Sequence, residues 1–70
     1  MNIGSKIQQD ILKFMEQQRR PVSTREICLA IGRAWHSIQN HCLRLQLAGE
    51  VNGFRVGNMN LWELRKRGKR

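Results

Sequence analysis

Apolar residues in the first half of the chain recur every three or four positions, the spacing that places side chains on one face of an α-helix. The first such stripe consists of Ile7, Ile11, Phe14 and Met15. It predicts a helix over about 5–18, with Ser5 and Gln8 spaced as a capping box at its start. Pro21 disfavours helical backbone at the residue before it, so the helix is expected to end there.

Two further helices are predicted on either side of a glycine. Ser23 and Glu26 have capping-box spacing at the start of the first, and Gly32 ends it because glycine readily adopts the left-handed conformation of a tight turn. The apolar face of this short helix is predicted to hold Ile27, Ala30 and Ile31. The next helix runs from about 34 or 35 to 48. Its buried face should hold Ala34, Ile38, Cys42 and Leu45, and its opposite face His36, Asn40, Leu43 and Leu47.

After Gly49 the pattern changes to the alternation that is typical of strands. Gly57-Asn58 is a two-residue turn motif, so Val51 to Leu64 is predicted to form a hairpin in which Gly53 faces Trp62. The small residue then leaves room for the indole to cover the helices. The outer face would hold Phe54, Val56, Met59 and Leu61, although a shift of one residue would exchange the two faces. A short extra strand near Val22 is compatible with this pattern.

The 70 residues suffice for one domain, predicted over 1–64 and followed by a disordered basic tail at 65–70. A hydrophobic content of 40% is too high for a disordered chain. The sequence contains neither an apolar run long enough to span a bilayer nor the pattern of a secretion signal. We therefore expect a cytoplasmic protein that has no membrane partner.

The net charge of +8 favours a polyanionic partner such as nucleic acid. Five of the thirteen basic residues lie in the tail, which leaves eight basic and five acidic residues in the rest of the chain. The tail can equally be a solubilising end, so charge indicates a class of partner and no more.

Cys28 and Cys42 are too few for a disulfide scaffold. A zinc site with His36 and His41 is disfavoured, because His41 and Cys42 would point about 100° apart on a helix. Buried thiols are the better interpretation, and no metal, cofactor or small-molecule ligand is expected. Neither histidine has a nucleophile or carboxylate at a suggestive spacing, so the sequence favours a protein without catalytic residues.

The order of elements resembles the winged helix-turn-helix superfamily. The resemblance is carried by Thr24 to Gly32 and then by Ile38, Cys42, Leu45, Ala48, Gly49 and Val51. It implies an α+β fold of three helices followed by a two-stranded hairpin, and a transcriptional regulator that binds double-stranded DNA. In length and in the ending 61–64 the chain resembles the small PapI/FaeA-like regulators of fimbrial operons. It departs from the pattern at Arg33, where an aliphatic residue is usual, and at Ala34, where Ser or Thr would cap the third helix.

The resemblance also implies which residues meet DNA, because the third helix of this superfamily lies in the major groove. Its outward residues are Trp35, His36, Ser37, Gln39, Asn40 and Arg44. Gln39 or Asn40 could pair with adenine through two hydrogen bonds, and Arg44 with guanine or phosphate. The residues expected at the backbone are Ser23, Thr24, Arg25 and Arg33, with Arg55 and Asn58 of the hairpin and Arg65, Lys66 and Arg67 of the tail.

Exposed apolar residues predict a second kind of partner. Leu29, Leu43 and Leu47 should point outward, in addition to Phe54, Val56, Met59 and Leu61 on the outer hairpin face. This is more apolar surface than a small monomer usually exposes. It indicates a protein interface, either with a second copy of the chain or with a second regulatory protein.

Three alternatives to reading B-form DNA stay open. A Z-alpha domain, which binds left-handed duplexes, resembles the chain in 11–14 and in Leu61-Trp62. Its pattern, however, has Asn, Arg and Tyr where this chain has Gln39, Asn40 and Leu43, and prolines where it has Met59 and Asn60. RNA binding is disfavoured because the sequence predicts no sheet surface with aromatic side chains on which bases could stack. A module that binds only protein is the main rival from another functional class.

Overall fold

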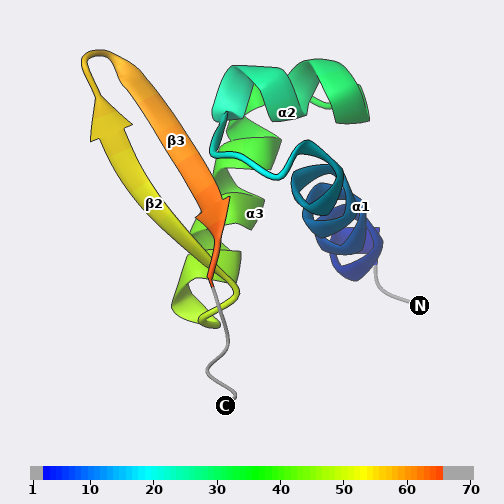
Figure 1. Cartoon of the computed structure of the whole chain (residues 1–70). Coiled ribbons are helices and arrows are strands. Elements are labelled where there is room, and N and C mark those ends of the chain that lie inside the picture. The colour runs from blue at the N-terminus through cyan, green and yellow to red at the C-terminus, as the bar shows by residue number, and fades with distance from the viewer. Residues whose placement is uncertain (1–2, 66–70) are drawn as a thin grey trace.

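The computed structural model describes residues 3–65, which form three helices and a three-stranded antiparallel sheet. The elements are α1 (Ile3–Gln18), β1 (Val22–Ser23), α2 (Thr24–Ile31), α3 (Trp35–Leu47), β2 (Val51–Val56) and β3 (Met59–Leu64). Figure 1 shows the hairpin of β2 and β3 on one side of α3, with α1 on the other side. The predicted α+β fold is confirmed, whereas Lys66 and Arg67 of the predicted tail lie outside the described residues.

The register of the sheet places β3 between β1 and β2. Gly53 lies opposite Trp62 and Val51 opposite Leu64, as the alternation predicts, so the one-residue shift is excluded. The turn is at Gly57, whose φ is 60°. The extra strand near Val22 is also present, since Val22 pairs with Trp62 and Ser23 with Leu61. β1 therefore covers the edge of β3 that β2 leaves free.

One core joins all the elements, and the helices contribute to it with the apolar faces that their sequences predict. Its buried members are Ile7, Ile11, Met15, Val22, Ile27, Ile38, Cys42, Leu45, Val51 and Trp62. Phe14 packs partly buried against them. Trp62 is only 3% exposed, so its indole lies over the helices as the small residue opposite it predicts. Among the described helices, none has the length and apolar character needed to cross a membrane.

The start of α1 differs from the prediction. The helix begins at Ile3, so Ser5 lies within it, and the predicted capping box of Ser5 and Gln8 is wrong. Ile3 continues the helical spacing of the apolar stripe and extends the helix by two residues. Gln8 instead contacts His41 of α3, with 3.2 Å between its amide nitrogen and His41 Nδ1. The end is as predicted: α1 stops at Gln18, and Arg19 takes a left-handed φ of 56° before Pro21.

The capping box of α2 is confirmed, because the Glu26 N–H donates to Ser23 Oγ at 3.0 Å and the Ser23 N–H to Glu26 Oε1 at 2.9 Å. Gly32 ends the helix in the left-handed conformation, with a φ of 78°. The predicted burial of Ala30 is wrong, since Ala30 is exposed. The face that meets the core holds the buried Thr24 and Ile27 and the partly buried Ile31, and Ala30 falls outside it.

In α3, the predicted buried residues Ile38, Cys42 and Leu45 are confirmed. Ala34 is exposed and is not part of this face. It occupies the N-cap position, where its backbone is extended and its side chain makes no capping hydrogen bond. The missing Ser or Thr therefore leaves the start of α3 without the side-chain acceptor that α2 has.

Candidate nucleic-acid interface

The outward surface of α3 brings the predicted recognition residues together on one helix. Trp35 is 45% exposed and its ring packs edge-on against His36, with the centroids 5.4 Å apart. Asn40 and Arg44 are also exposed, whereas Ser37 and Gln39 are half-buried. Trp35, His36 and Asn40 lie in the first two turns. This is the end of a recognition helix that meets base edges when the helix enters a major groove.

The N-terminus of α3 has the positive end of a helix dipole and no acidic residue in its first turn. Because Ala34 supplies no side-chain acceptor, the N–H groups of that turn are not capped by the preceding residue. Such a terminus attracts anions. The departure from the family pattern at Ala34 thus leaves this helix start without a side-chain acceptor or a nearby carboxylate.

The N-terminus of α2, unlike that of α3, is capped by side chains of the protein itself. The Ser23 hydroxyl and N–H both bond within the capping box. The Glu26 carboxylate at this position is held by Arg20, whose guanidinium is 2.6 Å away. The Arg20 hydrogen bond and then the Ser23 N–H lower the pKa of Glu26. A carboxylate therefore stands where Ser23 and Thr24 were expected to bind phosphate, and Arg25 is the residue of this group that remains exposed.

Thr24 does not face solvent, because its side chain is only 2% exposed. Its hydroxyl accepts a hydrogen bond from Trp62 Nε1 at 2.9 Å and donates one to Gln39 Oε1 at 2.9 Å. Trp62 is therefore a core residue whose N–H is already bonded. Thr24 supports Gln39 from within and does not itself present a hydroxyl to a ligand.

Acidic residues are absent from a long part of the sequence that builds this surface. Between Glu26 and Glu50 there is no aspartate or glutamate, and none between Glu50 and Glu63. The exposed arginines on these segments are Arg33, Arg44 and Arg55. The ion pairs within residues 3–65 join Lys6 to Asp10 and Arg20 to Glu26, on other elements. The outward surface of α3 and the part of the hairpin up to Trp62 thus carry arginines and no carboxylate, which the overall charge alone did not locate.

A groove of about 200 Å³ separates α3 from the hairpin. It is lined by Gln39, Leu43, Gln46, Gly53, Phe54, Arg55, Asn60 and Trp62. Gln46 and Asn60 are polar groove residues that the sequence analysis did not select. Asn60 pairs across the hairpin with Arg55, so the predicted register could have identified it. Nothing in the helical pattern distinguishes Gln46 from any solvated glutamine.

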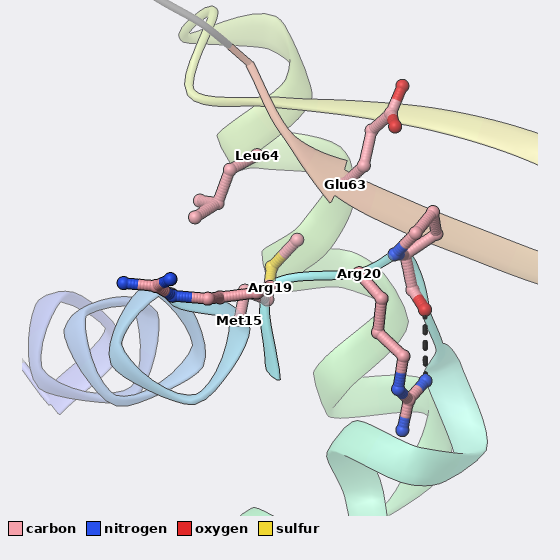
Figure 2. Close-up of a pocket in the computed structure, with 6 residues that line it drawn as sticks. Met15, Arg19, Arg20, Glu63 and Leu64 are labelled. Carbon is pink, nitrogen blue, oxygen red and sulfur yellow. Dashed lines mark hydrogen bonds between the residues drawn. The ribbon is translucent and has the colours of Figure 1, made fainter. Parts of the chain in front are cut away.

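A second hollow, of about 180 Å³, lies between the end of α1 and the end of β3 (Figure 2). It is lined by Met15, Arg19, Arg20, Pro21, Glu63 and Leu64. Arg20 donates to the Pro21 carbonyl at 3.1 Å and forms an ion pair with Glu26, so its guanidinium already has a carboxylate partner. Of the recognition residues predicted on α3, none lines this hollow. The arrangement offers no paired donors for an anion there.

The histidines and cysteines do not assemble into a reactive site. Among residues 3–65 no group of three or more potential metal ligands comes together. Both thiols are free, and burial raises the pKa of Cys28 and raises that of Cys42 to about 12. Burial, followed by the charges of Arg44 and Arg33, lowers the pKa of His41. Cys28, His41 and Cys42 are therefore neutral packing residues near pH 7.

The predicted apolar surface is exposed at most positions. Leu29 is 74% and Leu47 88% exposed, and Leu43 is 44% exposed. On the outer face of the hairpin, Phe54, Val56 and Met59 are between 39% and 52% exposed. Leu61 is only half-buried, since β1 pairs alongside it. The outer face of the hairpin therefore presents three large apolar side chains to solvent.

Comparison with known proteins bears on the fold. No family model and no curated protein matches the chain. Among solved structures, the Zalpha domain of Carassius auratus PKZ in complex with Z-DNA aligns with a TM-score of 0.79 and 19% identity, covering 90% of this chain and 98% of that one. A structure described for the DNA recognition and protein interaction domains of HOP2 aligns with a TM-score of 0.75 and 16% identity, covering 83% of this chain and 97% of that one. The fold is that of a winged helix.

In this winged helix, α2, the turn at Gly32 and α3 form the helix-turn-helix, and the hairpin of β2 and β3 is the wing. At 16% and 19% identity the likeness is one of fold. The narrower resemblance to the PapI/FaeA-like regulators stays a prediction.

Proposed function

We propose that this winged-helix domain binds double-stranded DNA and regulates transcription, acting in the cytoplasm on the nucleoid. The observation that carries the proposal is the outward surface of α3. It gathers Trp35, His36, Asn40 and Arg44 on one acid-free helix whose N-terminus lacks a side-chain cap. A helix of this kind fits the major groove of B-form DNA. One similar structure is described in complex with Z-DNA and the other for the DNA recognition domain of HOP2, and both support a nucleic-acid partner in general.

In this proposal the residues divide between bases and backbone. Asn40 pairs with adenine and Arg44 with guanine or phosphate, each good base contact being worth about 1–3 kcal/mol of discrimination. Trp35, His36 and Ser37 lie at the entering end of the helix. Phosphates are held by Arg25, Arg33, Arg55, Asn58 and Arg65, and the tail residues Lys66 and Arg67 add contacts that do not depend on sequence.

Selection of binding sites from random duplex DNA tests the proposal, using the full chain and a chain ending at Arg65. Both should enrich the same short motif, and the shorter chain should show a weaker dependence of affinity on salt, because fewer counterions are released. A left-handed CG-repeat duplex and a hairpin RNA serve as competitors. If neither chain enriches a motif and binding disappears with the tail, α3 does not read bases. Preference for the left-handed duplex would contradict the B-form geometry.

A matched pair of asparagine variants locates the contact surface. Asn40→Ala removes an exposed amide from α3, and Asn52→Ala removes one from the outer face of the wing. We expect Asn40→Ala to weaken binding to the selected motif by roughly 5- to 150-fold, the equivalent of about 1–3 kcal/mol. Asn52→Ala should leave the affinity unchanged. Equal losses in the two variants would show that α3 is not the reading element.

A second candidate function is protein contact, favoured by the exposed side chains of Phe54, Val56 and Met59 on one sheet face. These side chains could join two copies of the chain or bind a second regulatory protein. Sedimentation equilibrium over a range of concentrations tests self-association. A dimer together with a palindromic selected motif would support the first alternative. A monomer at the highest concentration would count against it.

A further inference from the structure

Three elements of the winged helix are joined by two consecutive hydrogen bonds. Trp62 of β3 donates to Thr24 of α2 at 2.9 Å, and Thr24 bonds Gln39 of α3 at 2.9 Å. Trp62 and Thr24 are 3% and 2% exposed, whereas Gln39 is half-buried and lines the groove between α3 and the wing. A buried pair thus supports a side chain that reaches the candidate interface.

The chemistry of these groups fixes the direction of each bond. An indole N–H can only donate, so the Thr24 oxygen accepts from Trp62. The single hydroxyl proton of Thr24 then needs an acceptor, and Gln39 Oε1 is the one it reaches. Rotating the Gln39 amide by half a turn would place its NH₂ group against Thr24 and leave the buried hydroxyl proton without a partner.

The other half of the Gln39 amide is available. Its nitrogen makes no hydrogen bond within residues 3–65, while its oxygen is turned towards the buried hydroxyl. Gln39 lines the groove, and because Thr24 holds its oxygen, the NH₂ group is the part of the amide that is left to bond a ligand there. Gln39 therefore presents donors to a ligand in the groove.

Building on the proposed function, we propose that Thr24 is a positioning residue that makes Gln39 a donor-only reader and so selects guanine over adenine. Guanine offers two adjacent acceptors, N7 and O6, in the major groove. Adenine offers one acceptor and one donor, so a glutamine that pairs with it through two hydrogen bonds must turn both its oxygen and its nitrogen towards the base. The orientation set by Thr24 disfavours that arrangement, so this proposal replaces the adenine pairing expected for Gln39 from sequence with pairing to guanine.

The hydrogen-bond chain is tested first in the free protein, without DNA. The Trp62 indole proton is followed by ¹H–¹⁵N NMR in the wild type, Thr24→Val and Thr24→Ser. In the wild type and in Thr24→Ser it should exchange slowly with solvent, and in Thr24→Val it should shift upfield and exchange at least 10-fold faster. An indole signal that is the same in all three proteins would overturn the proposal at its first step.

The base preference is tested by site selection with the same proteins and with Gln39→Met, which identifies the motif position that Gln39 contacts. At that position the wild type and Thr24→Ser should prefer guanine to adenine by at least 10-fold, and Thr24→Val should reduce the ratio at least 5-fold. A purely structural Thr24 would instead lower the affinity for all sequences equally and leave the ratio unchanged. That outcome, or a wild-type preference for adenine, would overturn the proposal.

Gln39→Glu gives a second test that does not disturb the buried pair. The carboxylate still accepts from Thr24 but replaces the outward donor with an acceptor, so the preferred base should change from guanine to cytosine, whose N4 amino group donates. Gln46→Glu is the matched control, because it adds the same charge to the same helix and groove. It should lower affinity without changing the preferred base, and an identical effect of both variants would contradict the proposal.

Failure of the proposed function is distinguishable from failure of this inference. If the wild type selects no motif, reading of B-form DNA fails and the base preference fails with it, whatever the indole proton shows. If it selects a motif but Thr24→Val and Gln39→Glu leave the preferred base unchanged, the domain reads DNA and the role of Thr24 is wrong.

Discussion

The two faces of the wing are built from alternate residues of the same strands, yet they differ in what they contact. On the inner face, Val51 and Trp62 are buried against the helices, and Gly53 lies beneath the indole. On the outer face, Phe54 and Val56 are exposed to solvent. The inner face therefore fixes where the wing stands relative to α3, whereas the outer face contributes little to folding.

This difference indicates that substitutions on the two faces should change different properties. Inner-face residues should control the free energy of unfolding and, through Thr24, the geometry of the groove. Outer-face residues should control association while leaving the free energy of unfolding nearly constant. The predictions below test this separation.

Gly53→Ala should have the largest effect on stability. A Cβ at this position would overlap the six-membered ring of Trp62 and lie 3.1 Å from Gln46 Oε1. Since the indole is buried and cannot simply move aside, we expect a loss of about 1–3 kcal/mol or more in the free energy of unfolding. Urea denaturation measures it, with Asn52→Ala on the outer face as the control. Equal midpoints for the two variants would show that the inner face is not closely packed.

Trp62→Phe should rank second. It removes the hydrogen bond to Thr24 and part of a buried ring, for an expected loss of about 1–2 kcal/mol. Trp35→Phe is the control, because Trp35 is 45% exposed and its replacement should change stability by no more than about 0.5 kcal/mol. A stability loss in Trp35→Phe as large as that in Trp62→Phe would mean that burial does not determine how much each tryptophan contributes to the free energy of unfolding.

A smaller effect is expected from pH, through the capping box that adjoins β1. The pKa of Glu26 is lowered from its ordinary value of 4.5 in the folded chain by the hydrogen bonds from Arg20 and Ser23. This contribution to stability is therefore present above about pH 4.5 and is lost as the pH falls through the folded-state pKa. Because the pair is partly exposed, we expect less than about 1 kcal/mol. The urea midpoint at pH 7 and pH 3 should differ less in Glu26→Gln than in the wild type.

The smallest effect on stability is expected on the outer face. Val56→Thr and Met59→Thr should each change the free energy of unfolding by less than about 0.5 kcal/mol. If this face joins two copies of the chain, both variants should shift the sedimentation profile towards the monomer. A large loss of stability in either variant would remove the distinction between the two faces.

Local patterns in the sequence predicted most of this fold. The alternation after Gly49, the turn at Gly57-Asn58 and the small residue opposite Trp62 together define the hairpin register, and all three act over short distances. The capping box of Ser23 and Glu26 is also a contact between near neighbours. The capping box predicted at Ser5 was wrong because a serine that begins a helix and a serine within a helix look alike in sequence, and the helix begins at Ile3.

The contacts that shape the candidate site act over long distances and could not be read from a pattern. Thr24 and Trp62 are 38 positions apart, and Gln8 and His41 are 33 apart. Periodicity correctly placed Asn40 and Arg44 on the exposed face of α3. It could not show that Thr24 points inward, because a threonine at the start of a helix is exposed or buried according to the tertiary neighbours it meets.

The rate at which the Cys42 thiol is alkylated should measure how often the domain unfolds. Only a thiolate reacts readily with alkylating reagents, and Cys42 is fully buried with its pKa raised to about 12. A reagent added to the folded protein should therefore modify the half-buried Cys28 first and reach Cys42 only after the helices separate. When the reagent reacts faster than the helices reclose, the slow phase of labelling reports the rate of unfolding without any denaturant. DNA that binds only the folded domain should lengthen that phase by the inverse of the unbound fraction, which is the factor 1 + c/Kd at a free DNA concentration c.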